Sequence, residues 1–463
     1  MAFHKSFVLL SCTFLGLVCG TLYLYSSFGP QLAQRLDYSA TDSSQLALCG
    51  SVGVALAGPG AGKIVDSRGF SLAIAVGAVV IALAYQGLRY QYLVGEAAAS
   101  VPVSMALMFL IGGGSTFINS ATIKCCAVCF PSIRGVATSL PLALYGLSAM
   151  VFSQMASVVC PGDTAKFLGF LAISVVAITA MCLPSIWFVD RIGVDAVVGT
   201  AKTTTETPHV TSDKEKSATT KAYAAKLEQP SLVSSPQFWV FFIVLGLGAA
   251  LGQMYIYSVG YMAKALLPKG TSEKIAAKTQ QGQVSIISVA NCIGRIVAGL
   301  LGDYVVSRKV PRSSLLLIPT SGLVFSQLLG LTISDASQLM VASWLNGFSY
   351  GFLFCAMPAV VADVFGLEKF SYNWGVINLS PIVPSYLLTS WFGKVYDANS
   401  EVVVMSSADA ATAASVVTKT HQCLHGAGCY AQVFRLTSWV AVLSVLVVLF
   451  YFSRRRWHAA PVA

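Results

Sequence analysis

Arg295 lies near the middle of a long apolar stretch at residues 288–305, "SVANCIGRIVAGLLGDYV". A guanidinium that faced lipid at this depth would cost ~2.5–3.5 kcal/mol on insertion scales, so we expect it to face a cavity or a buried polar partner. Asn291 precedes it by one helical turn and shares its face. Because the guanidinium fork suits carboxylate and phosphate, the pair predicts a site for a negatively charged group. The alternative is a structural arginine bonded to carbonyls and amides of neighbouring helices.

The sequence offers no obvious counter-charge for Arg295. No Asp, Glu or His lies well inside any of the apolar runs, and the five histidines are terminal or in loops. Asp303 follows Arg295 by eight residues, which is about 12 Å along a helix and too far for a direct pair. Backbone and amide groups, or the substrate itself, must therefore balance this charge.

The composition identifies the solvent in which these residues work. The 463 residues are 56% hydrophobic and 10% charged, with a mean hydropathy of +0.72. Soluble domains carry about 25% charged residues, so we expect the surface of this protein to contact the lipid bilayer. The net charge is +10, and most of the basic residues lie between the apolar runs. They are not interleaved with aromatic residues as in RNA-binding surfaces, so we expect no nucleic-acid partner.

Twelve apolar runs of membrane-spanning length divide the chain into two halves. We expect an N-terminal six-helix bundle at 1–189, a polar and largely disordered cytoplasmic linker at 190–236, and a C-terminal six-helix bundle at 237–463. The first run is longer than a signal-peptide core and lacks a clear cleavage site, so we expect it to be retained. The predicted fold class is an all-α membrane protein.

Basic residues indicate the orientation. They are more numerous in the segments that share a side with both termini and the linker, which predicts cytoplasmic termini and a multi-pass protein. These motifs do not separate the plasma membrane from the vacuolar membrane.

Two related loops suggest an internal repeat. The first follows the second run and contains Gly62, Asp66, Arg68 and Gly69, and the second follows the eighth run and contains Gly299, Asp303 and Arg308. Both begin G-x-x-x-D and are 237 residues apart. Arg134-Gly135 and Trp374-Gly375 repeat at the similar offset of 240 residues.

These loops resemble those of the major facilitator superfamily. Within it, "YSSFGPQLAQRLDYSATD", "RGVATSLPLALYGLSAMVFS" and "NCIGRIVAGLLGD" resemble the nodulin-like and monocarboxylate-transporter-homologue branch of fungi and plants. The resemblance implies two bundles around a central cavity and alternating access. Asp66 and Asp303 lie at expected helix ends near basic loop residues, so we expect them to act as latches between helices in one access state. The alternative for each aspartate is simple capping of the next helix.

The resemblance also implies which polar residues line the cavity. In the superfamily, spans one, four, seven and ten do so, which selects Tyr25, Asn119, Gln253, Tyr257, Asn346 and Tyr350. The alternative for each is hydrogen bonding between helices. Some monocarboxylate transporters have D-x-x-x-R where this chain has Asn291 and Arg295, and the amide cannot carry a proton.

The loop at 397–431 is predicted to be non-cytoplasmic and holds His421, Cys423, His425 and Cys429. An oxidising compartment favours a Cys423–Cys429 disulfide, with free thiols, a metal site or pairing with Cys160 as the alternatives. We expect no resident metal.

We therefore predict a secondary transporter that moves a small solute, such as a monocarboxylate or another organic anion, by alternating access. No catalytic motif is present, so we expect neither an enzyme nor a cofactor. We expect the protein to function as a monomer. The rivals are a permease for a neutral or cationic solute, and a nutrient sensor on a transporter scaffold.

Overall fold

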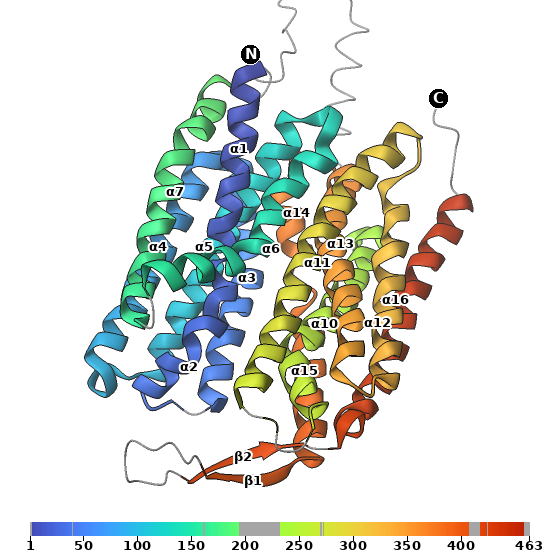
Figure 1. Cartoon of the computed structure of the whole chain (residues 1–463). Coiled ribbons are helices and arrows are strands. Elements are labelled where there is room, and N and C mark those ends of the chain that lie inside the picture. The colour runs from blue at the N-terminus through green and yellow to red at the C-terminus, as the bar shows by residue number, and fades with distance from the viewer. Residues whose placement is uncertain are drawn as a thin grey trace, which may run out of the picture.

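A computed structural model describes residues 2–38, 40–160, 163–193, 232–268, 271, 273–406, 417–423 and 425–457. Within these residues the chain is almost entirely helical, and each half of the sequence forms one bundle (Figure 1). Most of the linker predicted at 190–236, together with its predicted disorder, lies outside the described residues.

The N-terminal bundle contains six long helices, the first of which is extended by a 3-10 turn and a further helix. Its elements are α1 (Ala2–Cys19), η1 (Gly20–Leu24), α2 (Tyr25–Arg35), α3 (Ala40–Arg68), α4 (Phe70–Val94), α5 (Val101–Cys129), α6 (Arg134–Val159) and α7 (Thr164–Ile192).

The C-terminal bundle repeats this plan, with one helix divided in two and a β-hairpin before the last helix. Its elements are α10 (Pro236–Ala265), α11 (Glu273–Ser307), α12 (Leu317–Thr332), α13 (Ala336–Phe365), α14 (Phe370–Ile377), α15 (Ile382–Ala398), β1 (Glu401–Ser406), β2 (Val417–Gln422) and α16 (Ala431–Trp457).

The eleventh predicted span, residues 373–393, is not one continuous helix. Eleven helices of the described chain are long and apolar enough to cross a membrane, whereas this span is divided into α14 and α15. Pro381 and Pro384 have no N–H to donate to the carbonyls of residues 377 and 380, which removes two helical hydrogen bonds. The Ile377 carbonyl instead accepts a hydrogen bond from the Ser380 N–H at 3.1 Å, and the chain turns.

Small residues allow the two bundles to approach closely. The structure packs α3 of one bundle against α14 of the other, and α6 against α11. At the first crossing, a Cβ atom on Gly375 would lie 2.3 Å from the backbone of Gly58, so only glycine permits this approach. One apolar core cluster of the C-terminal bundle also includes Ile123 and Leu142 from the N-terminal bundle.

The start of α1 and the end of α16 lie at the same end of the molecule, and the β-hairpin lies at the other (Figure 1). We call these the terminal end and the hairpin end. The crossings of α3 with α14 and of α6 with α11 approach the terminal end, because α3 and α11 finish there at Arg68 and Ser307.

The loop predicted at 397–431 contains an antiparallel hairpin that was not expected. Its register pairs Glu401 with Gln422 and Ser406 with Val417. The run of valines in β1 has high β-propensity, which accounts for the strand. A disulfide joins Cys423 to Cys429, with Cα atoms 5.9 Å apart, and both cysteines are buried beneath the hairpin end of the bundle.

Candidate functional site

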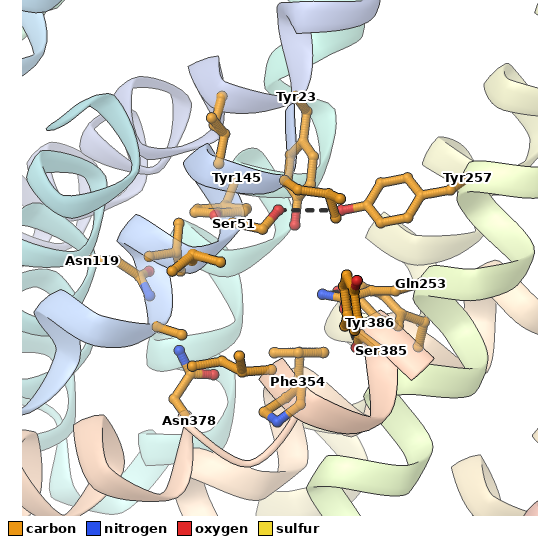
Figure 2. Close-up of a pocket in the computed structure, with 18 of the residues that line it drawn as sticks. Tyr23, Ser51, Asn119, Tyr145, Gln253, Tyr257, Phe354, Asn378, Ser385 and Tyr386 are labelled. Carbon is orange, nitrogen blue, oxygen red and sulfur yellow. Dashed lines mark hydrogen bonds between the residues drawn. The ribbon is translucent and has the colours of Figure 1, made fainter. Parts of the chain in front are cut away.

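A cavity of about 230 Å³ lies between the two bundles (Figure 2). Its apolar walls include Leu22, Phe354 and Trp374. Polar side chains from both halves of the sequence also line it: Tyr23, Ser51, Asn119, Tyr145, Gln253, Tyr257, Arg295, Tyr350, Asn378, Ser385, Tyr386 and Thr389. A space of this size, enclosed by helices near their midpoints, suits a small solute.

Arg295 is the cationic residue of this lining, and it is 2% exposed. Its Nε donates to Asn291 Oδ1 at 2.7 Å, and its Nη1 donates to the Leu142 carbonyl of α6 at 2.6 Å. The guanidinium carbon lies 5.3 Å from the centre of the Tyr145 ring. Arg295 forms no ion pair with any carboxylate of the described chain.

A network of uncharged groups forms another part of the lining. Gln253 Nε2 donates to Tyr350 Oη at 3.3 Å, and Ser385 Oγ donates to Gln253 Oε1 at 2.6 Å. These bonds connect α10, α13 and α15, so the position of the divided helix is tied to two cavity-lining helices.

Five residues of the predicted binding set line the cavity and three do not. Asn119, Gln253, Tyr257, Arg295 and Tyr350 line it. Asn291 accepts a hydrogen bond from Arg295 but is not in the lining, Tyr25 packs against Phe28, and Asn346 is fully buried outside the lining. The physical reason is that a span number does not say which face of its helix is turned to the cavity.

Several lining residues were not in the predicted set. Tyr23, Ser51, Tyr145, Asn378, Ser385, Tyr386 and Thr389 belong to spans one, two, five and eleven. The two prolines close together at 381 and 384 were the available signal for Asn378 and Ser385, because divided helices commonly line transport sites.

Asp66 joins the two bundles at the terminal end of the cavity. Its carboxylate accepts hydrogen bonds from the backbone N–H groups of Ser371, at 3.3 Å, and Tyr372, at 2.9 Å, in the first turn of α14. Lys124 Nζ lies 2.6 Å from Asp66 Oδ1 and also donates to the Glu368 carbonyl of the other bundle. Asp66 therefore caps a helix of the opposite bundle.

Asp303 makes the reciprocal contact. Its two carboxylate oxygens accept from the N–H groups of Gly135, at 2.7 Å, and Val136, at 2.9 Å, in the first turn of α6. Arg312 Nη2 lies 2.9 Å from Asp303 Oδ1. Asp363 accepts from Arg312 and, at 3.0 Å, from Arg134 of the N-terminal bundle.

The other residues of the predicted gating loops have different environments. Gly62 and Gly299 face the backbones of Ser371 and Gly135 respectively, and neither position has space for a Cβ atom. Gly69 has a φ of +91°. Arg68 is exposed and Arg308 lies over the Tyr304 ring, so Lys124 and Arg312 are the partners of the two aspartates.

Simple capping of the next helix is not what Asp66 does. The helix that follows it is α4, and the carboxylate of Asp190 accepts from the N–H groups of Phe70 and Ser71 at its start. Asp66 is thereby left to bind α14.

Toward the hairpin end, a hydrogen bond of 3.2 Å joins Ser51 Oγ of α3 to Tyr257 Oη of α10 (Figure 2). Ser51 precedes Asp66 by 15 residues of one helix, which places these two inter-bundle contacts about 22 Å apart. The cavity lies between them.

Neither the cavity nor the described remainder of the chain offers a metal centre. No group of three or more His, Cys, Asp or Glu side chains among the described residues is arranged to hold a metal ion.

Solved structures share this fold. The chain superposes on the proton:xylose symporter XylE with a TM-score of 0.67, covering 97% of this chain and 96% of that one at 14% identity. The major facilitator transporter FucP in its outward conformation gives a TM-score of 0.52, with 95% and 98% coverage at 14% identity. At these identities the likeness establishes the fold alone, which is the major facilitator fold.

Sequence comparisons give the nearer relationship. Residues 5–211 match the Nodulin-like family model. The chain is 27% identical to an uncharacterized membrane protein of Saccharomyces cerevisiae, over 98% of this chain and 95% of that protein. It is 25% identical to the probable transporter MCH1 of Wickerhamomyces anomalus, over 85% of this chain and 79% of that protein.

Proposed function

Because this chain is a nodulin-like member of the major facilitator superfamily, and so a multi-pass membrane transporter rather than an enzyme, we propose that its cargo is a small organic anion. The observation that carries the proposal is Arg295, a cation in the lining of the cavity with no carboxylate partner in the described chain.

The energetic argument starts from the environment of the guanidinium. Asn291, the Leu142 carbonyl and the Tyr145 ring supply hydrogen bonds and a ring face, but none of them carries a charge. In a medium of low dielectric constant an unneutralised charge is costly, so a bound anion would be stabilised there. A carboxylate that enters the cavity would therefore complete the set of partners of Arg295.

The cavity size and the uncharged network favour a small anion that also makes neutral contacts. Gln253, Tyr350 and Ser385 could orient its uncharged part, while Leu22, Phe354 and Trp374 would exclude water. A monocarboxylate fits this description. One chain supplies both sides of the cavity, which supports function as a monomer.

We infer that the terminal end faces the cytosol, since basic residues are concentrated there. On this orientation the two aspartate contacts close the cytosolic side. Transport would alternate between this arrangement and one in which Asp66 and Asp303 release α14 and α6 and the cavity opens inward.

The competing functions make different use of the same residues. If the existing contacts of Arg295 satisfy it, the residue is structural and the cargo is neutral or cationic. If the chain is a sensor, its output would depend on the linker, most of which lies outside the described residues, and deletion of that segment would abolish signalling while a carrier would keep its flux.

The test is uptake of radiolabelled monocarboxylates by proteoliposomes that contain the purified protein. We expect Arg295→Gln to reduce saturable uptake by about 100-fold, in line with the loss of a charged partner. Arg295→Lys keeps the positive charge but not the bidentate geometry of the guanidinium, so it should retain part of the saturable uptake. Undiminished uptake by correctly inserted Arg295→Gln would make Arg295 structural.

The same vesicles test coupling. Asn291 occupies the place where a carboxylate could exchange a proton beside Arg295, and its amide does not titrate. We therefore expect uptake to proceed without an imposed pH gradient. Uptake that requires an inward proton gradient would show that another group carries the proton.

A further inference from the structure

A small polar chamber adjoins the cavity and extends it toward the terminal end. Its volume is about 20 Å³, and it shares Val54, Asn119, Tyr145, Trp374 and Asn378 with the main cavity. Gly58 and Gly375, which meet where α3 crosses α14, also line it. The chamber therefore lies directly against the closed contact between α3 and α14.

Asn119 and Asn378 are the amides of this chamber. Asn119 belongs to α5 of the N-terminal bundle, and Asn378 follows α14 at the division of the eleventh span. Figure 2 shows both amide groups at the same side of the cavity. Neither amide hydrogen-bonds to protein within the described chain, whereas Asn291, also an amide, is engaged by Arg295.

The size of the chamber limits what can enter it. A space of about 10–15 Å³ accessible to a water-sized probe holds one water. The chamber, at about 20 Å³, therefore accepts a single oxygen atom with its hydrogen but not the three heavy atoms of a carboxylate.

Hydroxyl groups of the chamber walls indicate the polarity of the guest. Thr116 Oγ1 donates to the Val54 carbonyl at 2.8 Å, and Ser115 Oγ donates to the Cys19 carbonyl. Because their hydrogens are already used, the oxygens of Thr116 and Ser115 can only accept a hydrogen bond from the guest, which favours a group that donates one.

We propose that Asn119 and Asn378 form a second subsite, which binds a hydroxyl group of the transported anion. A hydroxyl can accept from the N–H of one amide and donate to the carbonyl oxygen of the other, so it would form hydrogen bonds with both bundles at once. This inference rests on the proposed function for its anion and names the cargo more narrowly, as a hydroxylated carboxylate.

The test compares matched acids that differ by one hydroxyl. The pairs are butyrate with gamma-hydroxybutyrate, caproate with omega-hydroxycaproate, and phenylacetate with para-hydroxyphenylacetate. The dissociation constant of each is measured from the dependence of the thermal midpoint of purified protein on acid concentration. We expect the hydroxylated member of at least one pair to bind about tenfold more tightly. The acid without the hydroxyl would leave both amides without a hydrogen-bond partner, which weakens its binding.

Variants assign the preference to the subsite. Asn119→Leu and Asn378→Leu should bring the ratio within a pair close to one. Asn346→Leu is the matched control, because it removes a buried amide that lines neither space, and it should keep the ratio. If a leucine variant does not fold, the smaller Asn119→Ala and Asn378→Ala are used instead.

The outcomes separate the two proposals. A preference that is absent from every pair, or that survives both subsite variants, overturns the hydroxyl subsite. If Arg295→Gln binds both members of a pair as tightly as the wild type, the anion proposal fails while the ratio still tests the subsite. If no acid binds the wild type, the anion proposal fails, and the methyl esters of the same pairs provide the ratio.

Discussion

The two ends of the cavity are closed by different chemistry. At the terminal end, Asp66 and Asp303 accept backbone N–H groups from helices of the opposite bundle and pair with Lys124 and Arg312. At the hairpin end, the inter-bundle hydrogen bond joins two uncharged hydroxyls, Ser51 and Tyr257.

The difference in strength follows from charge. Hydrogen bonds to charged groups contribute about 1.5–3 kcal/mol, whereas neutral ones contribute about 0.5–1.5 kcal/mol. A carboxylate at the start of a helix is also stabilised by the helix dipole. The comparison therefore assigns the larger barrier to opening of the terminal end and the smaller one to opening of the hairpin end.

The largest effect is expected where the two bundles touch through glycines. In Gly375→Ala the new Cβ atom would lie 2.3 Å from the backbone of Gly58, so α3 and α14 could not close. We expect uptake to be abolished, with spin labels on the two bundles reporting a wider terminal end.

Gly393→Ala is the matched control for this substitution. Its Cβ atom would meet nothing within 4 Å, so normal uptake is expected. Equal uptake by the two variants would show that the close glycine contact is dispensable.

The next largest effect is expected from loss of an aspartate. Asp303→Ala leaves the Gly135 and Val136 N–H groups without their acceptor and removes one partner of Arg312, and we expect closure to lose about 2–3 kcal/mol. Uptake should fall by one to two orders of magnitude as the terminal end stays open.

Asp303→Asn separates capping from charge, because an amide oxygen can still accept from the helix. We expect it to recover part of the uptake lost in Asp303→Ala. If the asparagine and alanine variants are equally impaired, the ion pair with Arg312 dominates over the cap.

The smallest effect is expected at the hairpin end. Tyr257→Phe removes the hydroxyl that meets Ser51 and keeps the ring, so closure there should lose about 0.5–1.5 kcal/mol. Uptake should change by less than tenfold. A loss as large as that of Asp303→Ala would contradict the proposed inequality of the two ends.

Local sequence was informative wherever an interaction depends on one helix or one loop. The two-bundle fold followed from apolar runs, and Arg295 with Asn291 followed from a spacing of one turn. Partners distant in sequence could not be predicted in this way. Asp66 pairs with Lys124, 58 residues away, rather than with the nearby Arg68.

The cavity lining was only partly predictable for a similar reason. Which side of a helix meets the other bundle depends on how the bundles dock, so Tyr25 and Asn346 were placed in the lining while Ser51 and Tyr145 were not. The division of the eleventh span depends on two prolines, whose effect on Asn378 and Ser385 becomes clear only when α15 is seen against α10.

The reciprocal capping by Asp66 and Asp303 has an evolutionary consequence. Each half of the chain carries the acceptor for the other half's helix and, in turn, offers the helix that the other half's acceptor needs. A substitution in either copy of the repeat therefore alters a contact that involves both halves. Two halves descended from one ancestral unit could diverge independently at the residues that line the cavity. At the contact that closes its terminal end, they could diverge only together.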